Sequence, residues 1–360
     1  MEKYRVGIVG ATGMVGQRFI SLLKDHPWFE VNCVAASARS AGKTYREAVG
    51  ERWAFSWEIP EKVAGMTVVD AADIDEVSKH VDFVFCAVDM KKDEIRALEE
   101  AYAKHEIPVV SNNSACRGIE DVPMVVPEIN ADHLAVIEAQ KKRLGTKNGF
   151  IAVKPNCSIQ SYVPALTPLL DFEPEKVSVC TYQAISGAGK TFKTWPEMVD
   201  NVIPYIGGED EKSENEPLKL WGHVEDGKIV NAALPVISAQ CLRVACSDGH
   251  MAAVSVSFKK KPTIEQIKER WANYETEAQR LELPSAPKPF LQYFEDPSRP
   301  QTRLDRDFQN GFGVSIGRLR EDTQYDYKFV CLSHNTLRGA AGGAVPVSYT
   351  HLRAHETCAD

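Results

Sequence analysis

The stretch YRVGIVGATGMVGQRFISLLK, residues 4–24, decides the fold of this chain. Residues 4–10 are a short apolar run that predicts a buried strand, and residues 13–24 carry apolar side chains at helical spacing. The alternation continues downstream. Further strands are predicted at 31–36, 81–87 and 108–110, and a helix at 92–104. Strands that alternate with helices predict a doubly wound parallel sheet of the Rossmann type, which we place at residues 1–153.

The turn between the first strand and the first helix carries glycine at every third residue. The pattern departs from GxGxxG, because its usable glycines are Gly10, Gly13 and Gly16. Glycines here allow a sharp turn and bring the N–H groups at the helix start close to a pyrophosphate. A glycine-rich turn without a ligand is the alternative, which the position directly after a strand disfavours. The predicted cofactor contacts in the turn are Gly10, Thr12, Gly13, Met14 and Val15.

The end of the second predicted strand indicates which dinucleotide binds. Enzymes that use NAD place an acidic residue there to hold the ribose 2′-hydroxyl. This chain has Ser37, Arg39 and Ser40 instead, with Lys43 close behind. Hydroxyl groups and cations suit a 2′-phosphate, so NADP is favoured. The alternative is an ordinary solvated basic loop.

A different pattern follows in residues 154–336, which we predict to be a second, α+β domain with a mixed sheet. Strand-like alternation occurs at 176–184, 240–246, 251–259 and 327–332, and helices are predicted at 159–170 and 263–281. The polar segment 207–217 and the proline-rich segment 284–300 are predicted to be surface excursions. Residues 337–345 are expected to return to the first domain.

Composition excludes several classes of function. The chain has 360 residues and a net charge of −8, which argues against sequence-independent binding of nucleic acid. Its nine cysteines are scattered without a metal-binding spacing, so we expect reduced thiols and no metal. No apolar run is long enough for a membrane span and the start lacks the features of a signal peptide, which indicates a cytoplasmic protein without a membrane partner.

One cysteine stands apart from the others by its context. Cys157 lies in KPNCS, where the first predicted domain gives way to the second and an apolar helix is about to begin. The positive end of a helix lowers the pKa of a thiol and favours the reactive thiolate. A thiol nucleophile needs a base, and His250 in RVACSDGH is the most suggestive histidine. From the residues alone, a buried structural cysteine and a histidine that caps a turn remain alternatives.

Nine motifs together resemble the aspartate-semialdehyde dehydrogenases, over residues 4–344 and most closely the archaeal and fungal branch of that family. In order along the chain they are GATGMVG, SARSAGK, NNSACR, VPEIN, PNCS, YQAISGAG, EPLK, RVACSDGH and NTLRGAAGG. The resemblance implies roles for individual residues. Cys157 would be the nucleophile, His250 the general acid and base, and Gln183 a catalytic group that orients the substrate.

The same resemblance implies how substrate and cofactor are held. Arg243 would bind the substrate α-carboxylate through two parallel hydrogen bonds, which its planar fork suits. Glu216 would meet the α-ammonium group, and Arg117 and Lys219 would hold the transferred phosphate. Asn156 is a further expected substrate contact. The nicotinamide half of NADP would contact Ser186, Gly187 and Asn335.

The implied reaction reduces L-aspartyl 4-phosphate to L-aspartate 4-semialdehyde through a thioester on the cysteine, with NADPH as the reductant. The product would feed lysine (through diaminopimelate), threonine and methionine synthesis, and the family forms homodimers or homotetramers. Two rivals remain. One is a sister reductase of N-acetylglutamyl phosphate or malonyl-CoA, for which Glu216 would have no role. The other is a non-catalytic NADP-sensing protein, which would need none of the four central side chains: Cys157, Gln183, Arg243 and His250.

The end of the chain departs from the resemblance. The family continues after RGAAGG into a long apolar helix, whereas here Pro346 is expected to interrupt and VSYTHLRAHETCAD follows. We therefore expect residues 346–360 to be a non-native tail. Loss of that helix would expose an apolar face of the first domain and lower stability.

Overall fold

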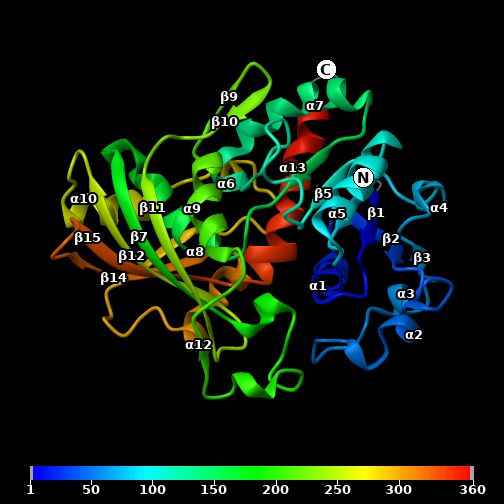
Figure 1. The fold of residues 1–360 in the computed structure, drawn as a ribbon, viewed down its shortest axis with the longest axis horizontal. Coiled ribbons are helices and arrows are strands. Elements are labelled where there is room, and N and C mark those ends of the chain that lie inside the picture. Colours follow the sequence, from blue (N-terminus) through cyan, green and yellow to red (C-terminus); the bar gives the residue numbers. More distant parts are fainter. Residues whose placement is uncertain (1–2, 357–360) are drawn as a thin grey trace.

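The first half of the chain forms an all-parallel sheet of six strands. The computed structural model describes the backbone of residues 3–356 and the side chains of residues 3–349. The sheet has the order β3-β2-β1-β4-β5-β6 (Figure 1). Its strands are β1 (Tyr4–Val9), β2 (Phe29–Ala36), β3 (Val69–Asp70), β4 (Phe83–Cys86), β5 (Val109–Ser111) and β6 (Ile151–Val153). The predicted doubly wound sheet is confirmed.

The connections between these parallel strands contain the helices of this domain. They are α1 (Met14–Leu23), α2 (Tyr45–Val49), α3 (Glu61–Ala64), α4 (Ile74–Ser78), α5 (Lys92–Lys104), α6 (Pro127–Asn130) and α7 (Ile137–Leu144). Helix α1 lies on the sheet through Phe19, whose ring stacks on that of Phe85 at 4.5 Å. A Cβ at Gly16 would lie 2.3 Å from the Gly10 carbonyl oxygen, so only glycine permits this approach of helix to turn.

The second half of the chain builds a mixed sheet of seven strands in the order β13-β14-β15-β12-β7-β11-β8. Strand β11 runs parallel to β7, while β12 is antiparallel to both β7 and β15. The strands are β7 (Pro174–Gln183), β8 (Val202–Ile203), β11 (Val236–Val244), β12 (His250–Phe258), β13 (Leu291–Phe294), β14 (Val314–Glu321) and β15 (Tyr327–Ser333); a separate hairpin holds β9 (His223–Glu225) and β10 (Lys228–Val230). The predicted mixed sheet is confirmed.

Helices cover one face of the mixed sheet. They are α8 (Ile159–Leu166), α9 (Glu209–Leu220) and α10 (Ile264–Ala272), and two shorter helices are α11 (Glu277–Arg280) and α12 (Thr302–Asp305). Trp271 of α10 is fully buried, packs edge-on against Phe329 of β15 and donates a 2.7 Å hydrogen bond to the Ala165 carbonyl of α8. On the opposite face the residues of the central strands β7, β11 and β12 are only half-buried or exposed, as at Cys180, Tyr182 and Ala253. That open face is available to a partner.

Three sequence expectations are wrong in this half. Segment 207–217 is not a surface excursion, because most of it belongs to α9, whose buried residues Glu209, Ser213 and Glu216 share one face. Segment 284–300 contains the edge strand β13. The single helix expected at 263–281 is broken into α10 and α11, and Thr263 and Thr276 each form the N-terminal cap of one of them.

The expectation that Pro346 interrupts the chain is also wrong. Helix α13 (Gly342–Glu356) runs through Pro346 and lies against the first domain, close to α1 and β5 (Figure 1). Pro346 is the fifth residue of the helix. The N–H group that proline lacks therefore removes a backbone hydrogen bond near the N-terminal end of the helix rather than in its middle. Val345, Val347 and Tyr349 are buried, so the helix covers an apolar face that was expected to be exposed. Residues 357–360 of the expected tail lie outside the described part.

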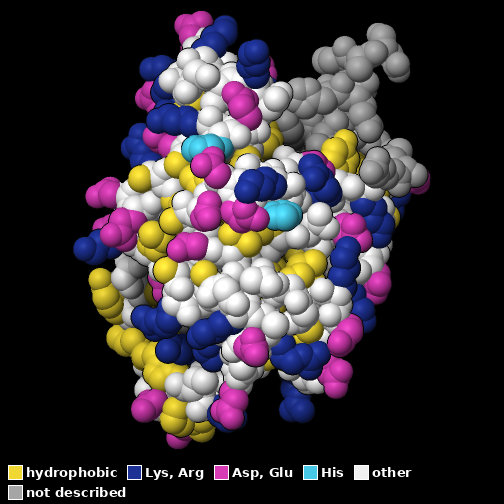
Figure 2. Space-filling model, turned by 90° about the vertical axis from the view of Figure 1, so that its right-hand side faces the viewer, with side chains coloured by type: hydrophobic (Ala, Val, Ile, Leu, Met, Phe, Trp, Pro, Cys, Tyr) yellow, Lys and Arg dark blue, Asp and Glu magenta, His cyan; other side chains and the backbone are white. Residues whose placement is uncertain are grey.

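The surface of the first domain mixes both signs of charge. Figure 2 shows Lys and Arg interspersed with Asp and Glu over this face. Among the described residues, no helix is long and apolar enough to cross a membrane. Nor do the described residues contain a group of His, Cys, Asp or Glu side chains that could hold a metal ion. The eight described cysteines are all free thiols.

Candidate active site

Four side chains meet where the two sheets adjoin, and the topology explains why. Cys157 follows β6, at the carboxyl edge of the parallel sheet. Gln183 ends β7, Arg243 is its register partner near the end of the parallel strand β11, and His250 begins the antiparallel strand β12. Parallel strand ends and an antiparallel strand start share one edge of a sheet. Residues 93 positions apart are thereby brought together.

The thiol and the imidazole are in contact. Cys157 Sγ lies 3.4 Å from His250 Nε2. The other ring nitrogen, His250 Nδ1, accepts a 3.0 Å hydrogen bond from the Ala184 backbone N–H. An imidazole nitrogen that accepts cannot carry the proton of the neutral ring, so that proton resides on Nε2 and points at the sulfur. The sequence-predicted pair is therefore in a geometry that allows proton transfer.

The expected lowering of the Cys157 pKa is not found. Burial raises the pKa of the Cys157 thiol and the Glu209 carboxylate raises it further, against the opposing cations Lys154, Arg243 and Arg117. Burial outweighs the start of α8, because a dry site disfavours the charged form. Burial also lowers the pKa of His250 well below its ordinary value, and Arg243 adds to this, so the ring is neutral. The neutral ring has its proton on Nε2, which suits the predicted role as an acid, and the predicted role as a base remains a prediction.

Two glycines create the space for this contact. A Cβ at Gly187 would lie 2.8 Å from Arg243 Nη1 and 2.9 Å from His250 Nε2. A Cβ at Gly339 would lie 2.9 Å from the Cβ of Cys157. Gly187 belongs to YQAISGAG and Gly339 to NTLRGAAGG, so both motifs are explained by close packing around the reacting pair. Sequence analysis predicted Gly187 as a cofactor contact and did not single out Gly339.

Arg243 is a buried cation that lacks a carboxylate partner at hydrogen-bond distance. Its Nη1 donates a 2.8 Å hydrogen bond to the Ala184 carbonyl, the same residue whose N–H holds His250. Burial lowers the pKa of Arg243, and in the described part of the chain it makes no salt bridge. A buried guanidinium without a counter-ion favours an anionic ligand. The predicted contact with a carboxylate remains a prediction that this environment supports.

Glu209, which sequence analysis missed, organises the residues around Cys157. Its carboxylate accepts hydrogen bonds from Gln183 Nε2 at 3.2 Å, Asn156 Nδ2 at 2.9 Å and Lys212 Nζ at 2.8 Å. The Asn156 side-chain oxygen accepts from the N–H and hydroxyl of Ser158. Asn156 is thus fully engaged within the protein, and its predicted contact with substrate remains a prediction. Among the residues whose side chains the structure describes, none donates a hydrogen bond to the Gln183 amide oxygen.

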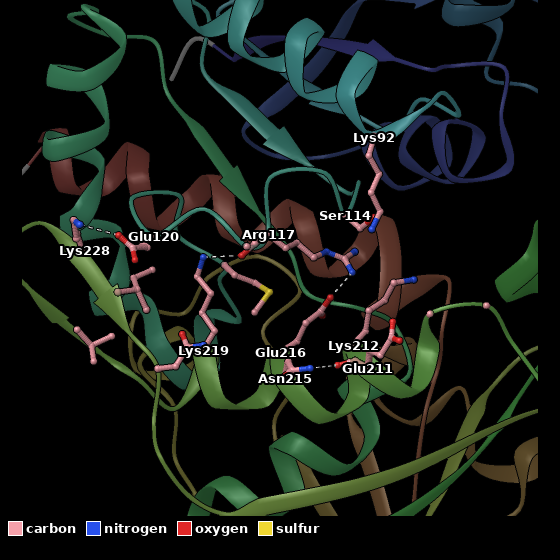
Figure 3. A pocket seen from close by; sticks show the side chains of 17 residues that line it. Lys92, Ser114, Arg117, Glu120, Glu211, Lys212, Asn215, Glu216, Lys219 and Lys228 are labelled. Atoms are coloured by element: carbon pink, nitrogen blue, oxygen red, sulfur yellow. Dashed lines mark hydrogen bonds and ion pairs between the residues drawn. The ribbon is translucent and has the colours of Figure 1, made fainter.

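A cleft of about 740 Å³ opens beside this centre, and three predicted residues line it (Figure 3). Arg117 pairs with Glu216 at 2.8 Å, and the second oxygen of Glu216 accepts from the Asn156 N–H at 2.6 Å. Lys219 donates to the backbone carbonyls of Arg117, Ile119 and Val122. An ammonium group has three donors, so Lys219 holds the loop that carries Arg117. For Lys219 to contact phosphate as predicted, its ammonium group would have to give up one of these three hydrogen bonds to backbone carbonyls.

The predicted cofactor contacts lie around the glycine turn. Gly10 has φ +91° and a Cβ there would clash with the Ala87 carbonyl, so the turn needs glycine. Helix α1 has no acidic residue in its first turn and no side-chain cap, which leaves its N–H groups free for an anion. Thr12, Met14 and Val15 are half-buried and Gly13 is exposed. These residues fit a pyrophosphate.

The remaining predicted cofactor residues fall into two groups. Ser37 and Arg39 are exposed just after β2, while Ser40 is buried. Asn335 accepts a hydrogen bond from the Gly249 N–H and donates to Ser186 Oγ, each at 2.8 Å. Asn335 therefore also ties the strand start at His250 to the turn at Gly187. The fold, the glycine turn and this thiol–imidazole contact together indicate the class of dinucleotide-dependent dehydrogenases.

Comparison with known proteins identifies the family. Residues 5–137 match the family described as semialdehyde dehydrogenase, NAD binding domain, and residues 166–338 match the dimerisation domain of the same family. The chain is 43% identical to aspartate-semialdehyde dehydrogenase of Archaeoglobus fulgidus over 95% of its length and 96% of the relative's. The corresponding protein of Schizosaccharomyces pombe is 44% identical, again over 95% of this chain and 96% of the relative.

A solved structure agrees with the sequence relatives. The structure of aspartate-semialdehyde dehydrogenase with NADP from Candida albicans has a TM-score of 0.87 and 37% identity, and it covers 97% of this chain and 98% of that one. The chain belongs to the aspartate-semialdehyde dehydrogenase family.

Proposed function

We propose that this protein catalyses the NADPH-dependent reductive dephosphorylation of L-aspartyl 4-phosphate to L-aspartate 4-semialdehyde. The observation that carries the proposal is the contact between Cys157 Sγ and His250 Nε2, at 3.4 Å. Membership of the family supports the substrate and the cofactor. A place in lysine, threonine and methionine synthesis and a cytoplasmic location remain proposals.

Cys157 and His250 act directly on the acyl group. The thiol proton is released to solvent, the His250 Nε2–H stabilises the Cys157 thiolate through a hydrogen bond, and the thiolate attacks the acyl carbon, so that a C–S bond forms and phosphate leaves. Bound NADPH would supply a hydride to the resulting thioester. His250 then donates its Nε2 proton to the departing sulfur as the aldehyde is released. Gln183, held through its NH₂ by Glu209, presents its amide oxygen to the reacting group.

The substrate and cofactor roles remain proposals that the charges support. Arg243 would bind the α-carboxylate, Glu216 the α-ammonium group, and Arg117 the phosphate, with Lys219 supporting the Arg117 loop. The exposed Arg39, with Ser37 and Ser40, would hold the 2′-phosphate of NADP. The first domain would extend over residues 1–153 with 337–345 returning, and the catalytic domain over 154–336.

A single assay tests the reaction. Aspartate semialdehyde, inorganic phosphate and NADP are expected to yield NADPH with the wild-type protein, and Cys157→Ala should reduce the rate to background. N-Acetylglutamate semialdehyde is run beside it, because activity with that aldehyde alone would assign the chain to the sister reductases. Turnover that survives in Cys157→Ala would exclude the thioester route.

Cofactor choice has its own test. We expect NADPH to be used far better than NADH, and Arg39→Ala to raise the KM for NADP about tenfold or more, because a charged hydrogen bond to phosphate contributes about 1.5–3 kcal/mol. Equal use of both cofactors by the wild type would contradict the assignment of Arg39. An unchanged KM for NAD in the variant is the internal control.

We further propose a homodimer formed through the open face of the mixed sheet. The match to a dimerisation domain and the half-buried residues of that face support this assembly. Light scattering should give twice the chain mass, and Tyr182→Asp, in the middle of the face, should shift it towards the monomer. A homotetramer would need a second interface.

A further inference from the structure

Lys154 is a buried cation that the mechanism above leaves without a role. It directly precedes the Pro155-Asn156-Cys157 turn and is only 3% exposed. Its ammonium group donates to the neighbouring Pro155 carbonyl, and in the described part of the chain it makes no salt bridge. Burial lowers the pKa of Lys154 to about 7, and the nearby Arg117 contributes to this shift. A charged lysine in this position lacks a counter-ion.

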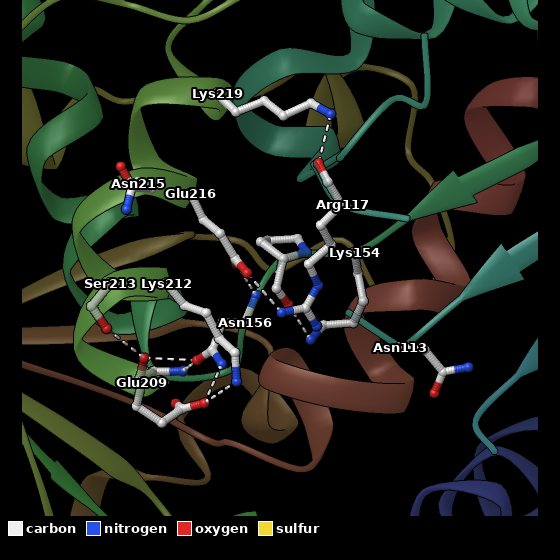
Figure 4. Close-up of polar contacts among 12 residues, drawn as sticks. Asn113, Arg117, Lys154, Asn156, Glu209, Lys212, Ser213, Asn215, Glu216 and Lys219 are labelled. Carbon is white, nitrogen blue, oxygen red and sulfur yellow. Dashed lines mark hydrogen bonds and ion pairs between the residues drawn. The ribbon is translucent and has the colours of Figure 1, made fainter. Parts of the chain in front are cut away.

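The surroundings of Lys154 distinguish it from Lys219. Lys219 uses all three of its donors on carbonyl oxygens at 2.7–2.9 Å, whereas Lys154 has two donors left. The groups whose charges reach Lys154 are Arg117, Cys157, Glu216 and Glu209. Figure 4 shows Lys154 beside Arg117, whose own Nε is buried without a hydrogen-bond partner. Two buried cations that repel each other would both be stabilised by an anion between them.

We propose that Lys154, together with Arg117, binds the phosphoryl group of the substrate next to Cys157. The proposal rests on the proposed function and adds a residue to it. When Cys157 attacks the acyl carbon, the C–S bond forms and the C–O bond to phosphate breaks, and the electron pair leaves on a phosphate oxygen. A cation within hydrogen-bond reach of that oxygen stabilises the departing charge. Lys154 is placed for this because it is three residues from the sulfur on the same turn.

The test measures phosphate directly as well as in turnover. Inorganic phosphate is titrated calorimetrically into the protein, and its KM is measured in the direction that consumes aspartate semialdehyde. Lys154→Met should weaken phosphate binding in the titration and raise the KM for phosphate, each roughly 10- to 100-fold, as expected for loss of a charge-assisted hydrogen bond. The KM for NADP should be unchanged. Lys92→Met, which removes an exposed cation from the cleft that Arg117 lines, is the matched control and should change phosphate affinity less than threefold.

The pH dependence provides a second readout that a purely structural role would not alter. Lys154 is protonated below about pH 7 and loses its proton above it, so phosphate affinity of the wild type should fall as the pH rises from 6 to 9. Lys154→Arg keeps its charge over this range, and its phosphate affinity should depend less on pH. Should Lys154→Met fail to fold, Lys154→Gln answers the same question.

The outcomes separate the two proposals. Phosphate binding by the wild type that is lost in Lys154→Met supports the role of Lys154, even if aspartate semialdehyde proves not to be the substrate. Phosphate affinity equal to wild type in Lys154→Met, or lost equally in Lys92→Met, overturns it. An active wild type with unchanged phosphate KM in Lys154→Met would leave the proposed function intact and exclude this residue.

Discussion

At the scale of single residues, Glu209 contributes to the electrostatic environment of Cys157, the proposed nucleophile. Burial raises the pKa of Cys157 most, the Glu209 carboxylate raises it further, and the same carboxylate accepts hydrogen bonds from the amides of Gln183 and Asn156. Removing its charge in Glu209→Gln should therefore lower the thiol pKa. The rate of iodoacetamide alkylation, followed against pH, should rise at a lower pH than in the wild type. Glu211→Gln, an exposed change on the same helix, should leave that midpoint in place, and a raised midpoint in Glu209→Gln would contradict the assignment.

Sequence motifs predicted most of the site residues. The residues and the pKa shift that were missed depend on burial, which the sequence does not reveal. Cys157 and His250 could be paired because PNCS and RVACSDGH occur together, and the structure brings their side chains into contact. Glu209 and Lys154 were missed because each looks like an ordinary solvated charge in the sequence. Only the tertiary fold shows that both are buried beside the sulfur. Desolvation is likewise invisible in a sequence, which is why the direction of the Cys157 pKa shift was predicted wrongly.

At the scale of elements, a short turn after β7 fixes the distance between the two halves of the site. The turn Ile185–Ala188 places Gly187 against Arg243 and His250. In Gly187→Ala the added methyl group would displace one of them, and a misplacement of about 1 Å can cost roughly 100-fold in rate. We expect kcat/KM to fall by about 10- to 100-fold with little change in Tm. Gly65→Ala, where a Cβ meets nothing within 4 Å, is the control, and full activity in Gly187→Ala would contradict this packing argument.

Periodicity predicted the elements whose buried face is apolar and failed where that face is polar. Strand β1 and helix α5 were placed within one residue of their observed bounds. Most of helix α9 was taken for a surface segment, because its buried positions are mainly polar, namely Glu209, Ser213, Glu216 and Lys219, and its one buried aliphatic residue, Leu220, is the last of the helix. Their spacing is helical, but polar residues at such spacing are usually solvated. A hydropathy pattern therefore does not predict a helix whose buried face is made of charged and polar residues.

At the scale of the whole molecule, one buried ion pair ties the returning chain to the first domain. Arg338 donates to both oxygens of Glu128 in α6, at 3.0 and 3.3 Å, and also to the Phe312 carbonyl, and the pair is almost fully buried. Arg338→Ala would leave the Glu128 carboxylate buried without its partner, which costs about 3–5 kcal/mol. Denaturant unfolding should show that loss in the free energy of unfolding.

Matched variants separate this pair from surface charge. Arg46→Ala removes the exposed partner of Glu61, whose side chain is 91% exposed, and should change the free energy of unfolding by less than about 0.5 kcal/mol. Glu128→Gln combined with Arg338→Ala should recover part of the loss, since no uncompensated charge would remain. Because Arg338 is adjacent to Gly339, which packs on Cys157, the single variant should also lose activity before it unfolds. Arg338→Ala with wild-type stability would show that the ion pair does not hold the returning segment to the first domain.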